Sequence, residues 1–281
     1  MLTIVMYRLH TLIALVVVVL PLRAAANTLP YDVVGHYPHS TALFTQGLEL
    51  FHGQLFESSG LYGHSKVIAR PFPEGSTAPE GSTGPEESTE TLRGVTLDKS
   101  LFAEGLTFHR GRLYLLTWRA GQLLEIDPER FALLRRHAYK GQGWGICYHS
   151  RRDLFAMSDG SDEIQWRRTS DFSLVDTLTI TGAGNYQHLN ELECHGDYIL
   201  ANQWKQPYLL VIDARSGEVV SQLDLSALIP EGLHQEAVLN GIAYDARDDT
   251  WLVTGKLWPK IYRIRFTLPV LETAKSAAKA G

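Results

Sequence analysis

Phe102-Ala-Glu-Gly-Leu-Thr-Phe108 is the stretch that decides the fold, because variants of it recur along the chain. The related stretches are Phe44-Thr-Gln-Gly-Leu-Glu-Leu50, Gly143-Trp-Gly-Ile-Cys-Tyr148, Leu189-Asn-Glu-Leu-Glu-Cys194 and Leu239-Asn-Gly-Ile-Ala-Tyr244. Aligned, they share a column that is mostly glycine, followed by leucine or isoleucine. The column just before the glycine varies and holds Gln46, Glu104, Trp144, Asn190 and Asn240. A period of about 40–50 residues is typical of propellers and solenoids.

Each repeat continues with short apolar runs that predict further strands. In the second repeat, Arg112–Thr117, Gln122–Ile126 and Leu134–Tyr139 follow the central stretch. Turn residues such as Asp127-Pro128 and Ser216-Gly217 separate such runs. No long window carries a helical period. We therefore predict an all-β chain with four antiparallel strands in each repeat.

The last repeat lacks a fourth strand, because little apolar sequence follows Lys260–Ile264. A spare strand candidate, Tyr31–Tyr37, stands before the first repeat and can take the missing place. Such closure leaves no long open edge. The predicted fold is a five-bladed β-propeller closed by the N-terminal strand, forming a single domain over residues 27–270. An open array of sheets is the alternative.

Three segments fall outside this repeat pattern. Residues 1–26 place Arg8 before an apolar run, Leu12–Leu22, and end in alanines, which is typical of a secretory signal peptide. An uncleaved membrane anchor is the alternative. Residues 73–90 are rich in Pro, Glu, Gly, Ser and Thr and predict a disordered insertion, with a segment that orders on binding as the alternative. Residues 271–281 predict a flexible tail.

The composition narrows the partners and the compartment. The chain has 26 Lys and Arg against 31 Asp and Glu, a formal net charge of −5 at pH 7. This balance does not favour nucleic acid. No second apolar stretch is long enough to cross a bilayer, so we expect no membrane association once the signal is cleaved. Export implies a periplasmic or secreted protein, which we expect to be a monomer.

The variable column and the ends of the second strands should meet at one mouth of the central channel. The first strand of a blade lines the channel and the second runs antiparallel to it, so the start of one and the end of the other share a rim. The rim residues are then Gln46, Glu104, Trp118, Trp144, Asp159, Asn190, Trp204, Asn240, Lys256 and Trp258. Four of the six tryptophans fall in this set, beside the carboxyl group of Glu104. Tryptophan also packs well between blades, but this grouping predicts a binding pocket.

Several motifs, taken together over residues 31–266, resemble the plant and bacterial glutaminyl cyclases. They include Phe44-Thr-Gln-Gly-Leu48, Glu57-Ser-Ser-Gly-Leu-Tyr-Gly63, Leu116-Thr-Trp118, Ala201-Asn-Gln-Trp204 and Val253-Thr-Gly-Lys-Leu-Trp-Pro259. The resemblance implies a five-bladed propeller that converts the N-terminal glutamine of peptides or proteins to pyroglutamate and releases ammonia. The chain departs from the family at Gln142, where relatives often have glutamate, and in the 73–90 insertion.

The resemblance also assigns roles within the predicted pocket. It places the catalytic glutamate at Glu104 and pocket residues at Gln46, Trp118, Trp144, Asn190, Trp204 and Lys256. We expect the catalytic residues to be Glu104, Asn190 and Lys256. We expect the substrate-binding residues to be Gln46, Trp118, Trp144, Trp204, Asn240 and Trp258.

The predicted chemistry needs one carboxyl group that moves protons. The α-amine attacks the side-chain amide carbon of the same residue, so positioning supplies much of the rate. One carboxyl group can take the amine proton and later give a proton to the departing ammonia. Aromatic walls around Glu104 would raise its pKa toward neutrality. Asn190, Gln46 or a tryptophan indole could donate to the tetrahedral oxygen. No cofactor is required.

Two other functions remain open on the sequence. Glu104, Asn190 and Asn240 could hold a hard cation, as in propeller lactonases, which predicts a metal-dependent hydrolase. Four tryptophans make a poor cage of oxygen ligands, however, and no histidine pair has zinc-site context, so we expect no metal. A non-catalytic peptide-binding propeller would also use a tryptophan-rich pocket, but it would not need Glu104.

Cys147 and Cys194 are the only cysteines, and an exported chain with two cysteines predicts a disulfide. Each lies on the channel-lining strand of its blade, in consecutive blades. Cys147 follows the rim position Trp144 by three residues and Cys194 follows Asn190 by four. Because side chains alternate across a strand, this opposite parity directs them to opposite sheet faces, as a bridge between stacked blades requires. Two buried free thiols are the alternative.

Overall fold

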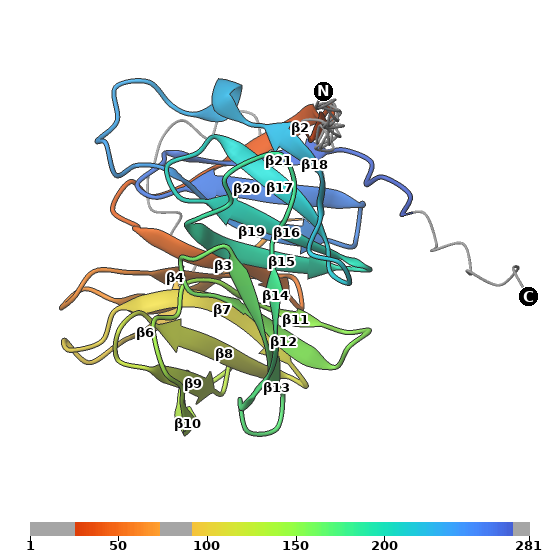
Figure 1. Cartoon of the computed structure of the whole chain (residues 1–281). Coiled ribbons are helices and arrows are strands. Elements are labelled where there is room, and N and C mark those ends of the chain that lie inside the picture. The colour runs from red at the N-terminus through yellow and green to blue at the C-terminus, as the bar shows by residue number, and fades with distance from the viewer. Residues whose placement is uncertain (1–25, 74–91, 272–281) are drawn as a thin grey trace, which may run out of the picture.

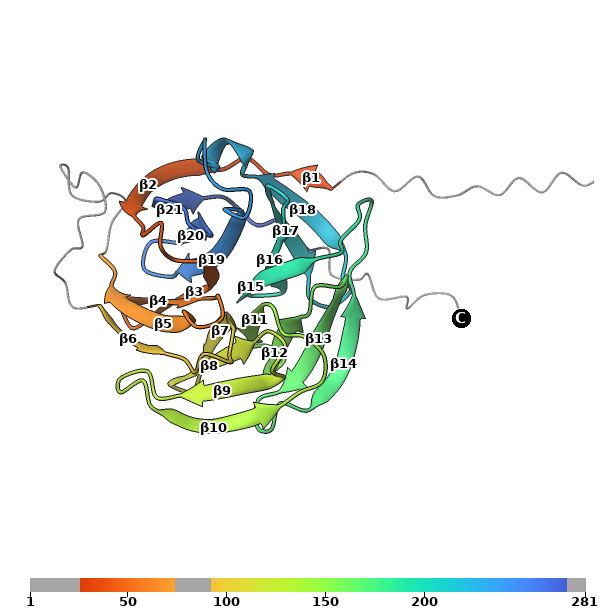
Figure 2. The same cartoon turned by 90° about the vertical axis from the view of Figure 1, so that its left-hand side faces the viewer.

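The computed structural model describes residues 26–73 and 92–271, which form five small sheets around a central axis (Figures 1 and 2). Each sheet contains four antiparallel strands, which follow one another in sequence from the axis outward except in the last blade, and one sheet carries an additional short parallel strand. The protein is therefore the five-bladed β-propeller that the repeats predict. The expected signal peptide, nearly all of the expected insertion and the expected tail lie outside the described residues.

The strands of the first three blades follow the predicted order closely. Blade one consists of β3 (Thr45–Phe51), β4 (Gln54–Ser59), β5 (Lys66–Pro71) and β6 (Arg93–Thr96). Blade two consists of β7 (Ala103–His109), β8 (Arg112–Thr117), β9 (Gln122–Ile126) and β10 (Leu133–Ala138). Blade three consists of β11 (Ile146–His149), β12 (Leu154–Ser158), β13 (Glu163–Arg168) and β14 (Leu174–Thr179). The innermost strands gather around the centre of the ring in Figure 2.

The last two blades contain elements beyond four consecutive strands: a short helix, the N-terminal strand and one added parallel strand. Blade four consists of β15 (Leu189–His195), β16 (Tyr198–Gln203), β17 (Tyr208–Asp213) and β18 (Val219–Asp224), followed by the short 3₁₀ helix η1 (Ser226–Leu228). Blade five consists of β19 (Leu239–Asp245), β20 (Thr250–Gly255), β21 (Lys260–Arg265) and the N-terminal β2 (Asp32–Pro38). The two-residue β1 (Asn27–Thr28) pairs in parallel with β18, a contact that the sequence did not predict.

The ring closes through the N-terminal strand, as predicted. β2 pairs antiparallel with β21 from Asp32 opposite Arg265 to Pro38 opposite Lys260. The first and last segments of the fold thus share one sheet. β2 thereby covers the outer edge of β21 and becomes the outermost strand of the fifth blade.

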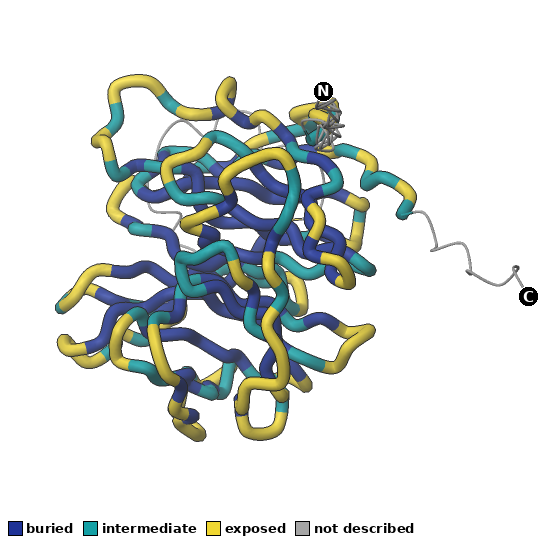
Figure 3. Tube along the Cα trace, viewed as in Figure 1, coloured by how far each residue is buried: buried dark blue, intermediate teal, exposed yellow. Residues whose placement is uncertain are grey.

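The core lies between the faces of neighbouring blades. Figure 3 shows the inner strands buried and the outer loops exposed. Trp166 of the third blade packs in one cluster with Leu192 and Ile212 of the fourth. Burial of such side chains contributes about 1.5–3 kcal/mol each. The outermost strands β10 and β14 are mostly exposed, so hydrophobic burial decreases away from the axis.

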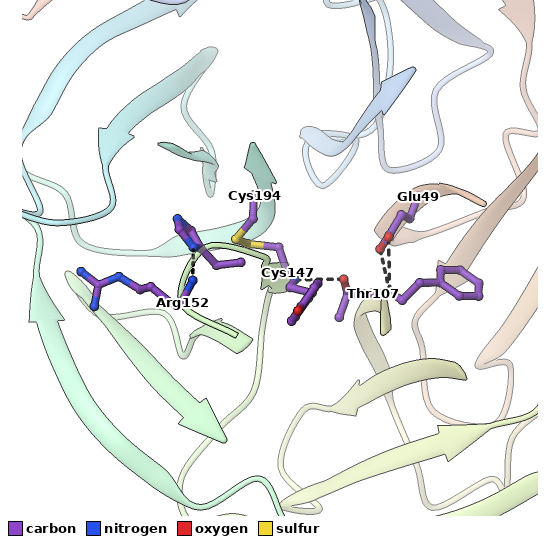
Figure 4. Close-up of a disulfide and its surroundings, with 8 residues drawn as sticks. Glu49, Thr107, Cys147, Arg152 and Cys194 are labelled. Carbon is purple, nitrogen blue, oxygen red and sulfur yellow. Dashed lines mark hydrogen bonds between the residues drawn. A yellow bond between two sulfur atoms is a disulfide. The ribbon is translucent and has the colours of Figure 1, made fainter. Parts of the chain in front are cut away.

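A disulfide joins Cys147 on β11 to Cys194 on β15, with the two Cα atoms 5.4 Å apart (Figure 4). The bridge links the channel-lining strands of the third and fourth blades. It closes a loop with a sequence separation of 47. The disulfide therefore ties together two inner strands that begin within two residues of the variable column, at Ile146 after Trp144 and at Leu189 before Asn190.

Candidate active site

The residues of the variable column leave the hydrogen-bonding ladder where the inner strands begin. In β7 the pairing passes from Ala103 directly to Leu106, so Glu104 is left unpaired. The same irregularity occurs at Gln46 in β3, Asn190 in β15 and Asn240 in β19. A bulge bends a strand and re-aims its side chains, and bulges are frequent beside active sites. Because the bulge takes these residues out of the strand pairing, their identity can vary while the pairing around them stays the same.

The glycine after the column allows neighbouring inner strands to touch. A Cβ atom on Gly105 would lie 2.8 Å from the carbonyl oxygen of Trp144. On Gly145 it would lie 2.0 Å from the carbonyl oxygen of Asn190. The Gly105 N–H also donates to the Trp144 oxygen at 2.7 Å. This close approach gathers the column residues of successive blades into one ring.

Serines on the second strands fix the backbone of the column in the next blade. Ser58 Oγ donates to the carbonyl oxygen of Glu104 at 2.6 Å, and Ser158 Oγ donates to that of Asn190 at 2.6 Å. All four residues are buried. Sequence reasoning missed these serines, although the two appear at the same point of their strands.

The carboxyl group of Glu104 and the amine of Lys256 form a buried pair near the mouth of the channel. Their side chains belong to residues that are 5% and 4% exposed. Burial raises the pKa of Glu104 well above its ordinary value, and the nearby Lys256 only partly opposes this. Burial lowers the pKa of Lys256 to about 8, with Glu104 acting in the opposite direction. Burial therefore shifts the pKa values of this carboxyl group and this amine in opposite directions, a perturbation that is frequent at functional sites.

Gln46 connects Glu104 to the fifth blade. Gln46 Nε2 donates to Glu104 Oε1 over 3.4 Å. Asn240 Nδ2 donates to Thr45 O at 2.9 Å and to Gln46 Oε1 at 3.4 Å. Asn240 is completely buried, like its neighbours in this ring, and it links Gln46 to the fifth blade.

Half-buried aromatic side chains lie around the polar residues Gln46, Glu104 and Lys256. They are Phe44, Trp118, Trp144 and Trp204. The rings of Trp144 and Trp204 meet edge to face with centroids 6.2 Å apart. Lys256 Nζ lies 4.7 Å from the centroid of Phe44, a wall residue that the sequence placed in a motif but not in the site.

Gln142 ties two of these tryptophans together. Its side-chain oxygen accepts the indole N–H of Trp118 at 2.6 Å and that of Trp144 at 3.2 Å. Both indole donors are thereby engaged within the wall. The neutral amide of Gln142 therefore fixes both rings.

Two expected site residues have environments that the sequence did not foresee. Trp258 is completely buried and its indole N–H donates to Ala237 O at 2.9 Å. Its ring packs directly on Gly255, the residue before Lys256. Asn190 is 2% exposed, and its Oδ1 has no hydrogen-bond partner among the described residues. An unpaired buried polar atom of this kind is uncommon and calls for a functional explanation.

Three further carboxyl groups lie on inner strands below the mouth, and the sequence analysis did not single them out. Glu49 accepts the backbone N–H of Phe108 at 3.1 Å (Figure 4). Burial raises the pKa of Glu49 to about 8 and raises those of Glu191 and Glu193 well above their ordinary value. Repulsion between these groups acts in the same direction. Glu191 replaces the usual glycine of its repeat, and its buried Oε2 has no hydrogen-bond partner in the part of the chain that the structure describes.

The described residues contain no group of three or more His, Cys, Asp or Glu side chains arranged to hold a metal ion. In the same part of the chain, no helix is long and apolar enough to span a membrane.

The five-bladed propeller thus places a buried carboxyl group, Glu104, and half-buried aromatic side chains at the starts of its inner strands and the ends of its second strands. The profile of a family described as glutamine cyclotransferase matches residues 9–266. The chain belongs to this family of enzymes.

Two relatives support the assignment over most of the chain. A glutaminyl-peptide cyclotransferase of Arabidopsis thaliana is 32% identical over 259 residues, which cover 89% of this chain and 73% of the relative. The crystal structure of Myxococcus xanthus glutaminyl cyclase superposes with a TM-score of 0.71 and 31% sequence identity. That match covers 86% of this chain and 98% of the other.

Proposed function

We propose that the protein cyclises the N-terminal glutamine of peptides or proteins to pyroglutamate and releases ammonia, with Glu104 as the proton-transferring group. The observation that carries this proposal is the buried Glu104, with its raised pKa, beside Lys256 and beneath the tryptophan wall. Family membership supports the reaction, and the arrangement of the site supports the role of Glu104.

The reaction requires two proton transfers around one ring closure. The neutral α-amine of the substrate attacks its own side-chain carbonyl carbon, and a C–N bond forms while the carbonyl π bond opens to an oxyanion. Glu104, in its carboxylate form, takes the proton that the attacking nitrogen loses. The same proton then passes to the amide nitrogen as the second C–N bond breaks, which restores the carbonyl and releases ammonia. A carboxyl group with a pKa raised toward neutrality suits both transfers.

Lys256 sets the charge of Glu104 in this scheme. Its ammonium form favours the carboxylate that accepts the first proton, because the two groups attract each other. Its own pKa of about 8 keeps it largely protonated at neutral pH. We therefore assign Lys256 the task of keeping Glu104 available as a base.

The oxyanion of the tetrahedral intermediate needs hydrogen-bond donors, and two of the indole N–H groups considered for this task already have a partner. Gln142 engages the indole N–H groups of Trp118 and Trp144. Gln46 and Asn190 carry side-chain amides in the ring around Glu104 and are the candidate donors. The aromatic wall then folds the flexible glutamine into a reactive shape and excludes water.

An assay with and without a chelator tests this proposal. Purified protein is incubated with a glutaminyl peptide, and ammonia and pyroglutamyl peptide are measured with and without EDTA. Equal turnover in both samples supports cyclisation by protein groups that need no metal or cofactor. Loss of activity in EDTA and its recovery with a divalent cation would favour a metal-dependent enzyme. Peptide binding without ammonia release would favour a non-catalytic propeller.

We further propose that the enzyme works outside the cytoplasm, as a monomer in the periplasm or in the medium, on peptides with N-terminal glutamine. Residues 1–26 have the composition of a signal peptide, and a disulfide suits an oxidising compartment. N-terminal sequencing of the protein from fractionated cells tests export, and a chain that retains Met1 in the cytoplasm would contradict it. Light scattering tests the monomer.

A further inference from the structure

The loop between β4 and β5 carries two large apolar side chains in solvent at the mouth. Leu61 is 41% exposed and Tyr62 is 48% exposed. The loop follows the end of β4, and β4 ends beside the start of β3 because Ser59 pairs with Thr45. It therefore belongs to the same rim as Gln46.

This loop adjoins the residues that surround Glu104. A Cβ atom on Gly60 would lie 2.3 Å from the ring of Phe102 and 3.1 Å from Cγ of Gln46. Phe102 directly precedes the bulge that holds Glu104. The backbone at Gly60, two residues before Tyr62, therefore lies against Phe102 and Gln46 of the proposed site.

Tyr62 extends the aromatic wall outward. Its ring meets Phe102 edge to face at 5.3 Å between centroids and lies 6.4 Å from Trp118. Phe102 and Trp118 are themselves 5.4 Å apart. The guanidinium group of Arg119 stacks at 3.9 Å from the centroid of Trp118. A continuous aromatic surface therefore leads from the half-buried Trp118 to the exposed Tyr62.

Hydrogen bonds hold this loop in one shape. Gly60 N–H donates to Phe44 O at 2.9 Å, and Gly63 N–H donates to Lys99 O at 3.2 Å. The Ser65 hydroxyl donates to Leu61 O at 2.9 Å. Leu61 has a φ of 91°, a left-handed conformation that is strained for leucine. An exposed apolar surface that is already ordered loses little entropy when it binds a ligand.

We propose that Leu61 and Tyr62 form a subsite for the side chain of the residue that follows the N-terminal glutamine, and that this subsite prefers aromatic or large aliphatic side chains. The inference rests on the proposed function, which places the glutamine beside Glu104. The second Cα lies only about 3.8 Å along the chain from the first, so its side chain reaches the neighbouring rim. Leu61 and Tyr62 offer an exposed aliphatic and aromatic surface there.

The test compares three substrates that differ only in the second residue: glutaminyl-phenylalanine amide, glutaminyl-leucine amide and glutaminyl-glycine amide. In the Tyr62→Ala variant we expect kcat/KM to fall about three- to tenfold for the first two, mainly through KM. For the glycine peptide we expect a change of less than about twofold. Tyr62→Phe keeps the ring and should keep the wild-type preference.

Leu174→Ala is the matched control, because Leu174 is 54% exposed but lies on the outer strand β14, away from the mouth. It should leave all three values unchanged. An equal loss for all three peptides in Tyr62→Ala, or no loss, would overturn the subsite while leaving the cyclase proposal intact.

If the wild-type protein released no ammonia from any of the three peptides, the proposed function would fall instead. Binding of the unreacted peptides, followed by tryptophan fluorescence, would then decide whether Tyr62 discriminates among second residues. Tighter binding of the phenylalanine peptide that is lost in Tyr62→Ala supports the subsite, and equal binding of all three peptides contradicts it.

Discussion

Asn240 in the fifth blade donates its side-chain amide to the carbonyl oxygen of Thr45 in the first blade, with 2.9 Å between the two atoms. The same amide nitrogen contacts Gln46, which in turn contacts Glu104. These two sheets are the last and the first blade, which are neighbours in the closed ring. One buried side chain therefore links closure of the propeller to the orientation of the group beside the proposed catalytic carboxyl.

Replacement of Glu104 by glutamine should abolish turnover and leave the fold intact. Glutamine has the same shape and can still contact Gln46, but it cannot carry a proton at neutral pH. We expect kcat to fall by about 10²–10⁴-fold, the range typical of a general acid or base. Ammonia release measures the activity, and circular dichroism checks the fold. A variant within tenfold of wild type would remove Glu104 from its role.

The tryptophan wall should matter more for turnover than for folding. Trp118, Trp144 and Trp204 are each half-buried, so replacement by alanine removes a surface that would touch the substrate. We expect kcat/KM to fall at least about tenfold for each variant through poorer positioning, with a melting temperature within about 2–4 °C of wild type.

The buried Trp166 provides the contrasting control for this wall. It is 1% exposed in the core between blades three and four, so Trp166→Ala should cost about 3–5 kcal/mol of the free energy of unfolding. If the wall variants instead unfold like Trp166→Ala while their folded fraction stays fully active, the wall is ordinary packing between blades.

The residues between β5 and β6 should be dispensable for catalysis. The β4–β5 loop lies at the mouth, so β5 runs away from it, and β5 ends and β6 begins on the opposite face. Deletion of residues 74–89 should leave kcat and KM within about twofold of wild type. A folded deletion variant that has lost activity would show that this connection reaches the site or that the site is on the other face.

The buried carboxyl groups below the mouth should make stability depend on pH. The pKa of Glu49 is raised to about 8, so the folded state holds its proton more tightly than the unfolded chain. Its contribution to stability is complete below pH ~4.5 and is lost as the pH rises through about 8. Glu191 and Glu193 act in the same direction, because their pKa values are also raised.

Urea unfolding at pH 5, 7 and 9 tests this expectation. Wild type should lose stability across the series, and Glu49→Gln should lose less, because glutamine has no proton to release. Glu163→Gln, at an exposed position on β13, serves as the control and should follow wild type. Parallel curves for Glu49→Gln and wild type would contradict the assignment.

The sequence predicted the architecture because each blade repeats a local pattern. The residues before the repeated glycine predicted which positions lie at the rim of the channel. The extra strand at Tyr31–Tyr37 predicted how the ring closes. The missed features depend on contacts between distant segments. No local pattern shows that Gln142 accepts two indole N–H groups, that Tyr62 continues the wall, or that the two residues of β1 pair with β18. Trp258 was placed at the mouth by its position in sequence, but its side chain turns into the core.

The disulfide between Cys147 and Cys194 gives the last prediction. Alkylation of the unfolded, unreduced protein should find no reactive thiol, and reduction beforehand should expose two. Because the bridge joins segments 47 residues apart, its loss should lower the free energy of unfolding by about 2–4 kcal/mol, mainly by enlarging the freedom of the unfolded chain.

The double variant Cys147→Ala, Cys194→Ala provides the comparison for this measurement. The bridge lies on the inner strands away from the aromatic wall, so the variant should keep wild-type kcat at 25 °C and unfold at a lower urea concentration. Under reducing conditions the unfolding curve of wild type should approach that of the variant. Two reactive thiols in unreduced protein purified from an oxidising compartment would refute the bridge, and a variant as stable as oxidised wild type would show that it does not restrain the unfolded chain.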